Sequence, residues 1–131
     1  MKLRSDFSQD WPYVGLPSVV KKMQSSGAVL SEVTNTFACK DPTTGSACTV
    51  APGNRYFPFV SQSVETANDL SGAQLPTLTT TTQYDAFGNA TSVVVSTGDG
   101  YIKTTTNTYT NDTANWFLGR LTRSTVQSTA P

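Results

Sequence analysis

The sequence predicts an all-β protein built from antiparallel strand–turn–strand units that form an extended or curved sheet. Thr and Ser together make up 36 of the 131 residues, and Thr suits the pleated, partly exposed surface of a sheet. Stretches rich in Gly, Asn and Asp, which are residues of turns, separate four strand-like runs in the second half of the chain, at 77–84, 90–96, 101–109 and 121–129.

Composition and charge restrict the classes of function. Lys plus Arg and Asp plus Glu both number 9, so the formal net charge is zero, and no basic run is present to neutralise phosphates. Nucleic acid is therefore not an expected partner. No apolar run has the length of a membrane span, and the N-terminal region lacks the basic start and apolar stretch of a signal peptide. We expect neither a membrane span nor a signal peptide within this sequence.

The first 76 residues carry weaker signals. Residues 1–17 contain two prolines among aromatic and polar residues, which predicts an irregular or extended N-terminal segment. Residues 18–76 predict degenerate hairpin units. In the first of these units, two alternating apolar runs meet at the SSG of 25–27. The alternative is a short helix over 18–26 that begins at Ser18, but Val19 next to it is a poor helix former.

Proline and cysteine residues add two more expectations in this half. The strand-like run at 55–67 contains Pro58, so we expect that strand at a sheet edge or a bulge. Cys39 and Cys48 flank a stretch with turn chemistry, CKDPTTGSAC. Two alternatives remain open for this pair. A disulfide across a hairpin would close a loop of about ten residues and stabilise the fold by about 2 to 3 kcal/mol; two reduced thiols would be ordinary for a protein folded in the cytosol.

A loose repeat appears when the turns are aligned, because in each of them an Asp is followed by a Gly a few residues later. The pairs are Asp41 and Gly45, Asp69 and Gly72, Asp85 and Gly88, and Asp112 and Gly119. A short acidic side chain accepts hydrogen bonds from the backbone N–H groups of a turn, and glycine adopts the positive φ that closes it. This spacing predicts one strand pair per unit, stacked on the next.

The second half also resembles a known repeat. The stretch YDAFGNATSVVVSTGDGYIKTTTNTY is similar to the tyrosine–aspartate (YD) repeat of the Rhs family, in the type found in bacterial insecticidal toxin complexes (B and C components) and in virulence proteins similar to the Salmonella plasmid toxin B. The following NDTANWFLGRLTRSTV is similar to the segment that closes such a unit. The residues that carry the resemblance are Tyr84, Asp85, Gly88, Asn89, Tyr109, Asp112, Trp116, Gly119, Arg120 and Leu121.

The resemblance is good over 77–127 and looser over 11–76, and it implies a slice of a much longer chain. Family members wind such strand pairs into a hollow shell that encloses a toxic C-terminal segment. On this interpretation residues 77–131 are YD-repeat-like hairpins, and the whole slice is a non-catalytic structural segment of a secreted or cell-surface bacterial protein. Its partners are the remainder of the shell and the enclosed toxin segment. The free edges of such a slice predict self-association.

A wall between two aqueous spaces needs strands that are polar on both faces. The runs TTTTQY and KTTTNTY carry Thr or Asn at alternating positions, which fits that requirement. Arg120 is a candidate for an ion pair with a carboxylate of a neighbouring turn, such as Asp112.

No pattern predicts catalysis or a bound cofactor or metal. His is absent, and the nine acidic residues are scattered, mostly at expected turns where capping explains them. We therefore assign no catalytic, cofactor-binding or metal-ligating residue. A second hypothesis from another class is a surface module that binds a glycan or a host protein through exposed aromatic residues, although most aromatic residues on strands pack against neighbours.

Overall fold

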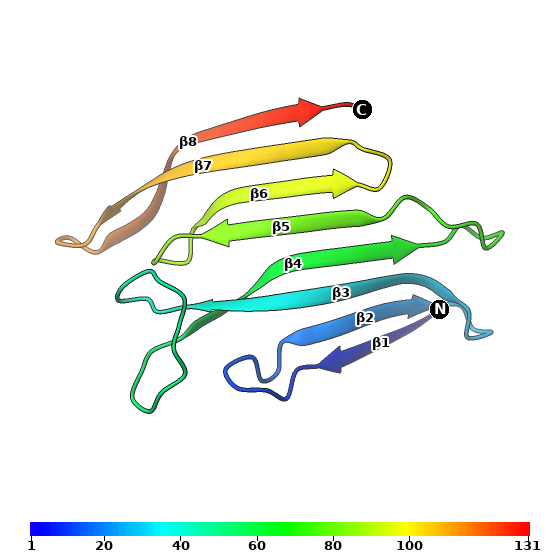
Figure 1. Cartoon of the computed structure of the whole chain (residues 1–131), viewed down its shortest axis with the longest axis horizontal. Coiled ribbons are helices and arrows are strands. Elements are labelled where there is room, and N and C mark those ends of the chain that lie inside the picture. The colour runs from blue at the N-terminus through cyan, green and yellow to red at the C-terminus, as the bar shows by residue number, and fades with distance from the viewer.

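The computed structural model describes residues 1–131 and contains one eight-stranded sheet and no helix. Each strand pairs antiparallel with the next along the chain, in the order β1 to β8 (Figure 1). The strands are β1 (Lys2–Phe7), β2 (Pro17–Met23), β3 (Val29–Lys40), β4 (Phe57–Ala67), β5 (Leu78–Tyr84), β6 (Ala90–Thr97), β7 (Ile102–Asp112) and β8 (Phe117–Thr129). The prediction of an all-β antiparallel fold is confirmed.

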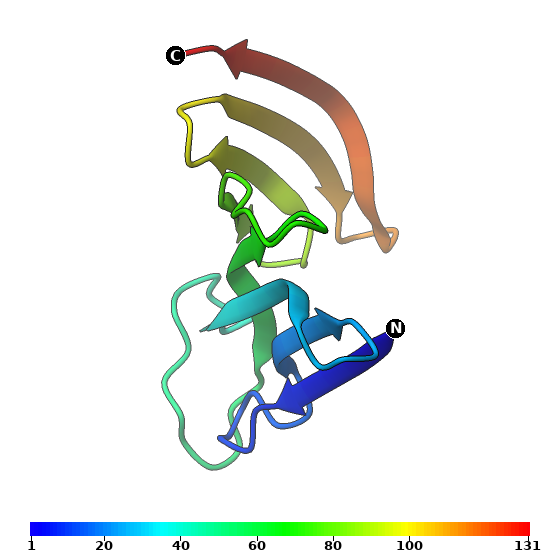
Figure 2. The ribbon, with the colours of Figure 1, turned by 90° about the vertical axis from the view of Figure 1, so that its right-hand side faces the viewer.

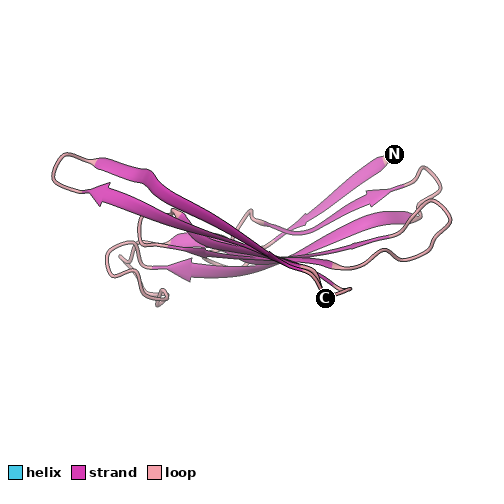
Figure 3. Cartoon of the chain, turned by 90° about the horizontal axis from the view of Figure 1, so that it is seen from above, coloured by secondary structure: helices cyan, strands magenta, loops and turns pink.

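The sheet is curved and strongly twisted, and it stays open. Seen from the side, the strands bend along the C-terminal half (Figure 2); seen from above, strands of the two halves cross at a wide angle (Figure 3). The two outer strands, β1 and β8, lie at opposite edges. Because the structure contains no helix, none is present that could span a membrane.

The N-terminal part agrees with one expectation and corrects another. Residues 1–17, expected to be irregular or extended, are extended over Lys2–Phe7, which form β1 and pair with β2; turns and bends are confined to residues 8–16. The helix alternative over 18–26 is wrong, and the hairpin is present. Val19 and Val20 lie in β2 opposite residues of β3, since β-branched side chains fit a pleated strand better than a helix.

The four strands expected in the second half are present as β5 to β8. The last of them starts at Phe117 rather than at 121, because pairing between β7 and β8 continues to Asp112 and Phe117 at the turn. Pro58 lies in a part of β4 that pairs with β3 alone, and a bulge follows at Ser61. This agrees with the expected edge or bulge.

The sheet has almost no core. Cys39 is the one buried residue among 131, and no helix or second sheet covers either face. A compact monomer of 14.0 kDa exposes about 6,700 Å², whereas this chain exposes 8483 Å². Folding therefore removes about 58% of the surface of the unfolded chain, in place of the roughly two-thirds expected at this length.

Charged residues lie on both faces of the sheet. On one face Glu65 lies directly between Val33 of β3 and Leu78 of β5, and it takes part in neither of the two ion pairs of the chain. On the other face Lys21 and Glu32 form an ion pair of 2.8 Å. A charged group covered by an apolar layer would lose its hydration. Since each face carries charged groups, both faces are suited to contact with water.

The ladder between β4 and β5 is the shortest in the sheet. It joins four residues of each strand, Gln62–Glu65 and Leu78–Thr81, whereas β3 with β4 and β7 with β8 each join ten. We call this short ladder the seam. It divides the sheet into two halves of four strands, β1 to β4 and β5 to β8.

Candidate functional site: linked turns and aromatic residues at one end of the sheet

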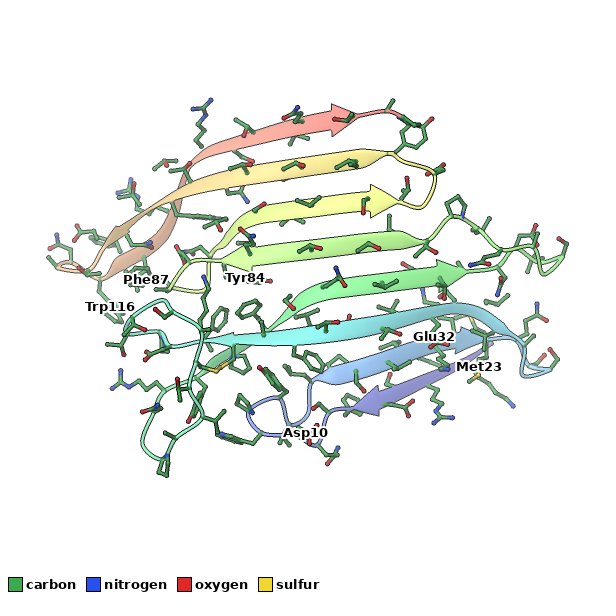
Figure 4. All side chains as sticks on the ribbon, viewed as in Figure 1. Asp10, Met23, Glu32, Tyr84, Phe87 and Trp116 are labelled. Carbon is green, nitrogen blue, oxygen red and sulfur yellow. A yellow bond between two sulfur atoms is a disulfide. The ribbon has the colours of Figure 1, made fainter.

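The residues of the predicted motif gather at one end of the sheet. The turns that follow β1, β3, β5 and β7 all lie at this end, on the left of Figure 1. Figure 4 labels Tyr84, Phe87 and Trp116 at this end, and Phe87 and Trp116 line the same open hollow. The turns after β2, β4 and β6 lie at the opposite end.

Asp85 and Gly88 shape the turn between β5 and β6. Asp85 Oδ1 accepts hydrogen bonds from the backbone N–H groups of Phe87 and Asn89, each at 2.9 Å. The N–H of Asp85 donates to the carbonyl of Asn89 at 3.0 Å. Gly88 has φ +82, a value that L side chains rarely adopt. This is the turn chemistry that the Asp–Gly repeat predicts.

The same five-residue turn occurs four times, at 24–28, 69–73, 85–89 and 97–101. In each, the N–H of the first residue donates to the carbonyl of the fifth, and a glycine at the fourth position has positive φ and donates to the carbonyl of the first. This pattern is typical of hairpin loops that contain a left-handed glycine. The sequence repeat missed two of the four, because Gln24 and Thr97 occupy the position of the Asp; the glycine at the fourth position was the signal.

Hydrogen bonds join the β5–β6 turn to the β7–β8 hairpin. The amide of Asn89 donates to Asp85 Oδ2 at 2.9 Å and to Asn111 Oδ1 at 3.3 Å. The amide of Asn111 donates to Asp85 Oδ2 at 3.3 Å, and its Oδ1 accepts the N–H of Gly119 at 2.8 Å. Sequence reasoning brought Asp85, Asn89 and Gly119 forward but missed Asn111, which connects them. We call these four residues the turn link.

Gly119 is required in the turn link for two reasons. Its φ is +72, and a Cβ at this position would lie 2.8 Å from Asn89 Oδ1. Any side chain would therefore strain the backbone and displace the carboxamide of Asn89.

The hydrogen bonds of the turns lower the pKa of four aspartates. Partial burial raises the pKa of Asp85, but the donors on Asn89, Phe87 and Asn111 outweigh it and hold the pKa below its ordinary value. The other three follow the same rule: the pKa is lowered at Asp41 chiefly by the N–H of Thr43, at Asp69 by the Ser71 hydroxyl and at Asp112 by the Asn115 amide.

Tyr84 packs across the seam beyond the last pair of its ladder. Its ring centroid lies 5.6 Å from that of Phe57 and 4.9 Å from that of Phe59, both on β4. Its carbonyl accepts a hydrogen bond from Lys40 Nζ on β3. Gly88 completes the contact, because the position of its missing Cβ lies 3.4 Å from the Phe57 ring. We call Phe57, Phe59 and Tyr84 the aromatic cluster.

Trp116 occupies an unusual backbone position. Its φ is +59, the one positive value at a residue other than glycine, and its side chain is 76% exposed. It borders an open hollow of ≈ 440 Å³ whose other lining residues include Arg55, Phe57 and Phe87.

Arg120 on β8 does not form the ion pair that the sequence suggested with Asp112 on β7. The Asp112 carboxylate instead accepts hydrogen bonds within its own turn, from the N–H of Asn115 at 3.0 Å and its amide at 2.9 Å, while Arg120 is exposed and belongs to no ion pair. Leu121 lies opposite Tyr109 in the ladder; Leu121 is exposed and Tyr109 is half-buried.

Cys39 and Cys48 are joined by a disulfide, with their Cα atoms 5.5 Å apart. The N–H of Cys48 also donates to the carbonyl of Cys39 at 3.0 Å. The bond therefore holds the start of the long β3–β4 loop against the end of β3, and Figure 4 draws it in yellow. Of the two alternatives left open by the sequence, the structure has the disulfide.

The geometry of this end of the sheet is that of a structural connection. The carboxylates of Asp41 and Asp112 accept hydrogen bonds within their own turns, and that of Asp85 also accepts one from Asn111. No three metal-binding side chains come together anywhere in the chain. No family model, no curated protein and no solved structure matches the sequence.

Proposed function

We propose that the chain is a non-catalytic structural segment of an Rhs/YD-repeat shell, which encloses the C-terminal toxin of a large secreted bacterial protein. The observation that carries the proposal is the burial of one residue, Cys39, among 131. An independent domain buries its sheet under a second layer. A sheet with two open faces and two unpaired edges is instead suited to serve as part of a wall.

The polarity of the two faces supports this proposal. A shell wall contacts water outside and an enclosed, unfolded segment inside, so neither face can depend on apolar burial. Glu65 on one face and the Lys21–Glu32 pair on the other meet this requirement, because charged groups retain their hydration there.

Contacts between successive hairpins support the repeat character of the proposed wall. The turn link joins the β5–β6 turn to the β7–β8 hairpin. Elsewhere, the amide of Asn35 on β3 donates to the carbonyl of Pro17 on β2 at 2.8 Å, and the amide of Asn107 on β7 donates to the carbonyl of Ala90 on β6 at 3.0 Å. Each contact reaches back to the previous strand or hairpin, so further units can be added without a new kind of interaction.

The first experiment determines the complete gene product from which the sequence comes. We expect further strand–turn units on both sides and an unrelated segment at the C-terminus. A gene product that consists of these residues alone would remove the shell from consideration.

The second experiment is limited proteolysis of that complete protein. The C-terminal segment should resist digestion while the shell is intact and should become sensitive when the shell is opened by denaturant. Equal sensitivity in both conditions would contradict enclosure.

A second candidate function is the binding of a glycan or a host protein, and the exposure of aromatic residues at one end favours it. Trp116 is 76% exposed, Trp11 65% and Phe87 47%, and aromatic faces stack on sugars and on protein partners. A glycan array followed by a titration of Trp fluorescence tests this candidate. Binding that Trp116→Ala abolishes would support it, and a flat response in both assays would reject it.

A further inference from the structure

Strand β8 leaves one long edge of the sheet without a partner. Its thirteen residues, Phe117–Thr129, pair with β7 on one side and with no strand on the other (Figure 1). Eleven of the thirteen are exposed. A row of free N–H and C=O groups of this length is a template for another strand.

The opposite edge lacks this property. Strand β1 has six residues, and three of them are charged: Lys2, Arg4 and Asp6. Short edge strands with charged side chains oppose pairing with another chain. In β8 the charges are confined to Arg120 and Arg123, and the residues from 124 to 129, STVQST, are uncharged and contain no proline.

We propose that the free edge of β8 binds a second copy of this chain, with the two β8 strands antiparallel about a two-fold axis. Pairing of β8 with β1 of another copy is disfavoured, because β1 is a short strand with three charged residues. That arrangement is also head-to-tail and would continue into an open filament, whereas pairing of β8 with itself closes after two copies. The result is one continuous sheet of twice the width.

The charges of β8 restrict the position of the axis. An axis at Arg123 would give the greatest overlap, but it sets the two Arg123 side chains directly opposite each other, and like charges there destabilise a sheet. An axis between Ser124 and Val126 separates them. With the axis at Val126, which is 59% exposed, the two valines meet and each Arg123 faces Thr129. We therefore place the axis within 124–126.

This inference extends beyond the proposed shell, since in a complete shell the next strand of the same chain would occupy the edge. The shell is tested on the parent gene product, and the dimer is tested on the present chain, so each can fail without the other.

The first test is sedimentation velocity over a dilution series. We expect a species of about 28 kDa, twice the 14.0 kDa of the chain, which dissociates on dilution. Thr125→Lys places a charge in the uncharged half of the edge and should raise the dissociation constant at least about tenfold. Ser5→Lys, the matched change on β1, should leave it unchanged. A monomer at all concentrations, a ladder of larger species, or equal weakening by both variants would overturn the proposal.

The second test does not depend on a disruptive variant. Ser124→Cys, Thr125→Cys and Val126→Cys are each exposed to mild oxidation with the Cys39–Cys48 bond intact. Opposite residues of an antiparallel pair are close enough for a disulfide, so at least one variant should form a covalent dimer, and Ser5→Cys should form none. Absence of a dimer from all three variants would overturn the assignment of this edge.

Discussion

Single residues in the turns at the motif end hold backbone conformations that most side chains avoid. Gly88 and Trp116 both adopt a positive φ there, one without a side chain and one with a large side chain. Gly88 adopts φ +82 next to the Phe57 ring, and it has no Cβ to strain. Trp116 adopts φ +59 with a large side chain, at a cost of about 1 to 2 kcal/mol that glycine would not incur.

Substitution of Gly88 by Val tests the turn. A β-branched residue at this φ should lower the free energy of unfolding by about 1 to 3 kcal/mol, and its side chain would also press on Phe57. Gly88→Asn is the matched control, because Asn tolerates the left-handed region. Chemical denaturation of both variants checks the prediction, and unchanged stability of the Val variant would contradict it.

Substitution of Trp116 by Gly should have the opposite effect. The exposed indole contributes little packing, so removal of the strain should raise the free energy of unfolding by about 0.5 to 1 kcal/mol after the greater entropy of unfolded glycine is allowed for. Thermal unfolding measures this change. A loss of stability would mean that the indole packs in the hollow instead of extending into solvent.

Stability should decrease in acid because of Asp85. Its folded-state pKa lies below its ordinary value and the unfolded value is about 3.9. The stabilisation is therefore fully present above the unfolded value and is lost as the pH falls through the folded pKa. Asp85→Asn removes this titration, so the free energy of unfolding should fall less steeply as the pH drops below the unfolded pKa of about 3.9. Asp99→Asn, at an exposed turn, is the control; an equal slope for wild type and Asp85→Asn would refute the assignment.

The β3–β4 loop is the connection that the disulfide of the chain constrains. The disulfide holds residues 41–47 in a closed loop at the end of β3. Because the loop contains no strand of its own, its conformation rests on this bond and on local contacts such as that of Tyr56 Oη, which donates to the carbonyl of Ala51 at 2.6 Å.

Reduction should lower stability by about 2 to 3 kcal/mol, as expected for a loop of about ten residues. Cys48→Ser should be as unstable as the reduced wild type and insensitive to reductant. Unfolding with and without reductant measures the effect. A titration that finds two free thiols in the native, unreduced protein would contradict the bond.

The sequence predicts strands and turns better than it predicts contacts between turns. Runs rich in Thr and Val predict β5 to β8, because β-branched residues suit strands and turn residues separate the runs. The Asp–Gly spacing predicts the turn at 85–89. The turn link could not be predicted, since Asn111 reaches Asp85 across 26 positions. Strand β1 could not be identified as a paired strand either. It forms by pairing with β2, and its sequence, KLRSDF, has no alternation of apolar and polar residues that would indicate a strand.

At the scale of the whole molecule, the halves on either side of the seam are joined by few hydrogen bonds. The four paired positions of each strand in the seam lie at the centre of the sheet. The aromatic cluster and the hydrogen bond from Lys40 Nζ to the carbonyl of Tyr84 add further connections. Local opening should therefore begin at the seam, because regions with few contacts open first.

Hydrogen exchange can follow this opening. Amides in 62–65 and 78–81 should exchange faster than those at the centre of the β7–β8 ladder. Tyr84→Ala should accelerate exchange at the seam a further two- to tenfold or so, which corresponds to about 0.5 to 1.5 kcal/mol for an aromatic contact. Tyr101→Ala, at an exposed turn, is the control. Uniform protection across all strands would contradict the weakness of the seam.

The seam also has a mechanical consequence. A sheet resists bending about an axis parallel to its strands in proportion to the ladder that crosses that axis, so bending stiffness is lowest where four positions, Gln62–Glu65, carry the pairing. Flexure of a larger sheet that contained this segment would concentrate at the seam. The radius of curvature of such a sheet would then be governed by Phe57, Phe59 and Tyr84, which limit the angle between the two halves.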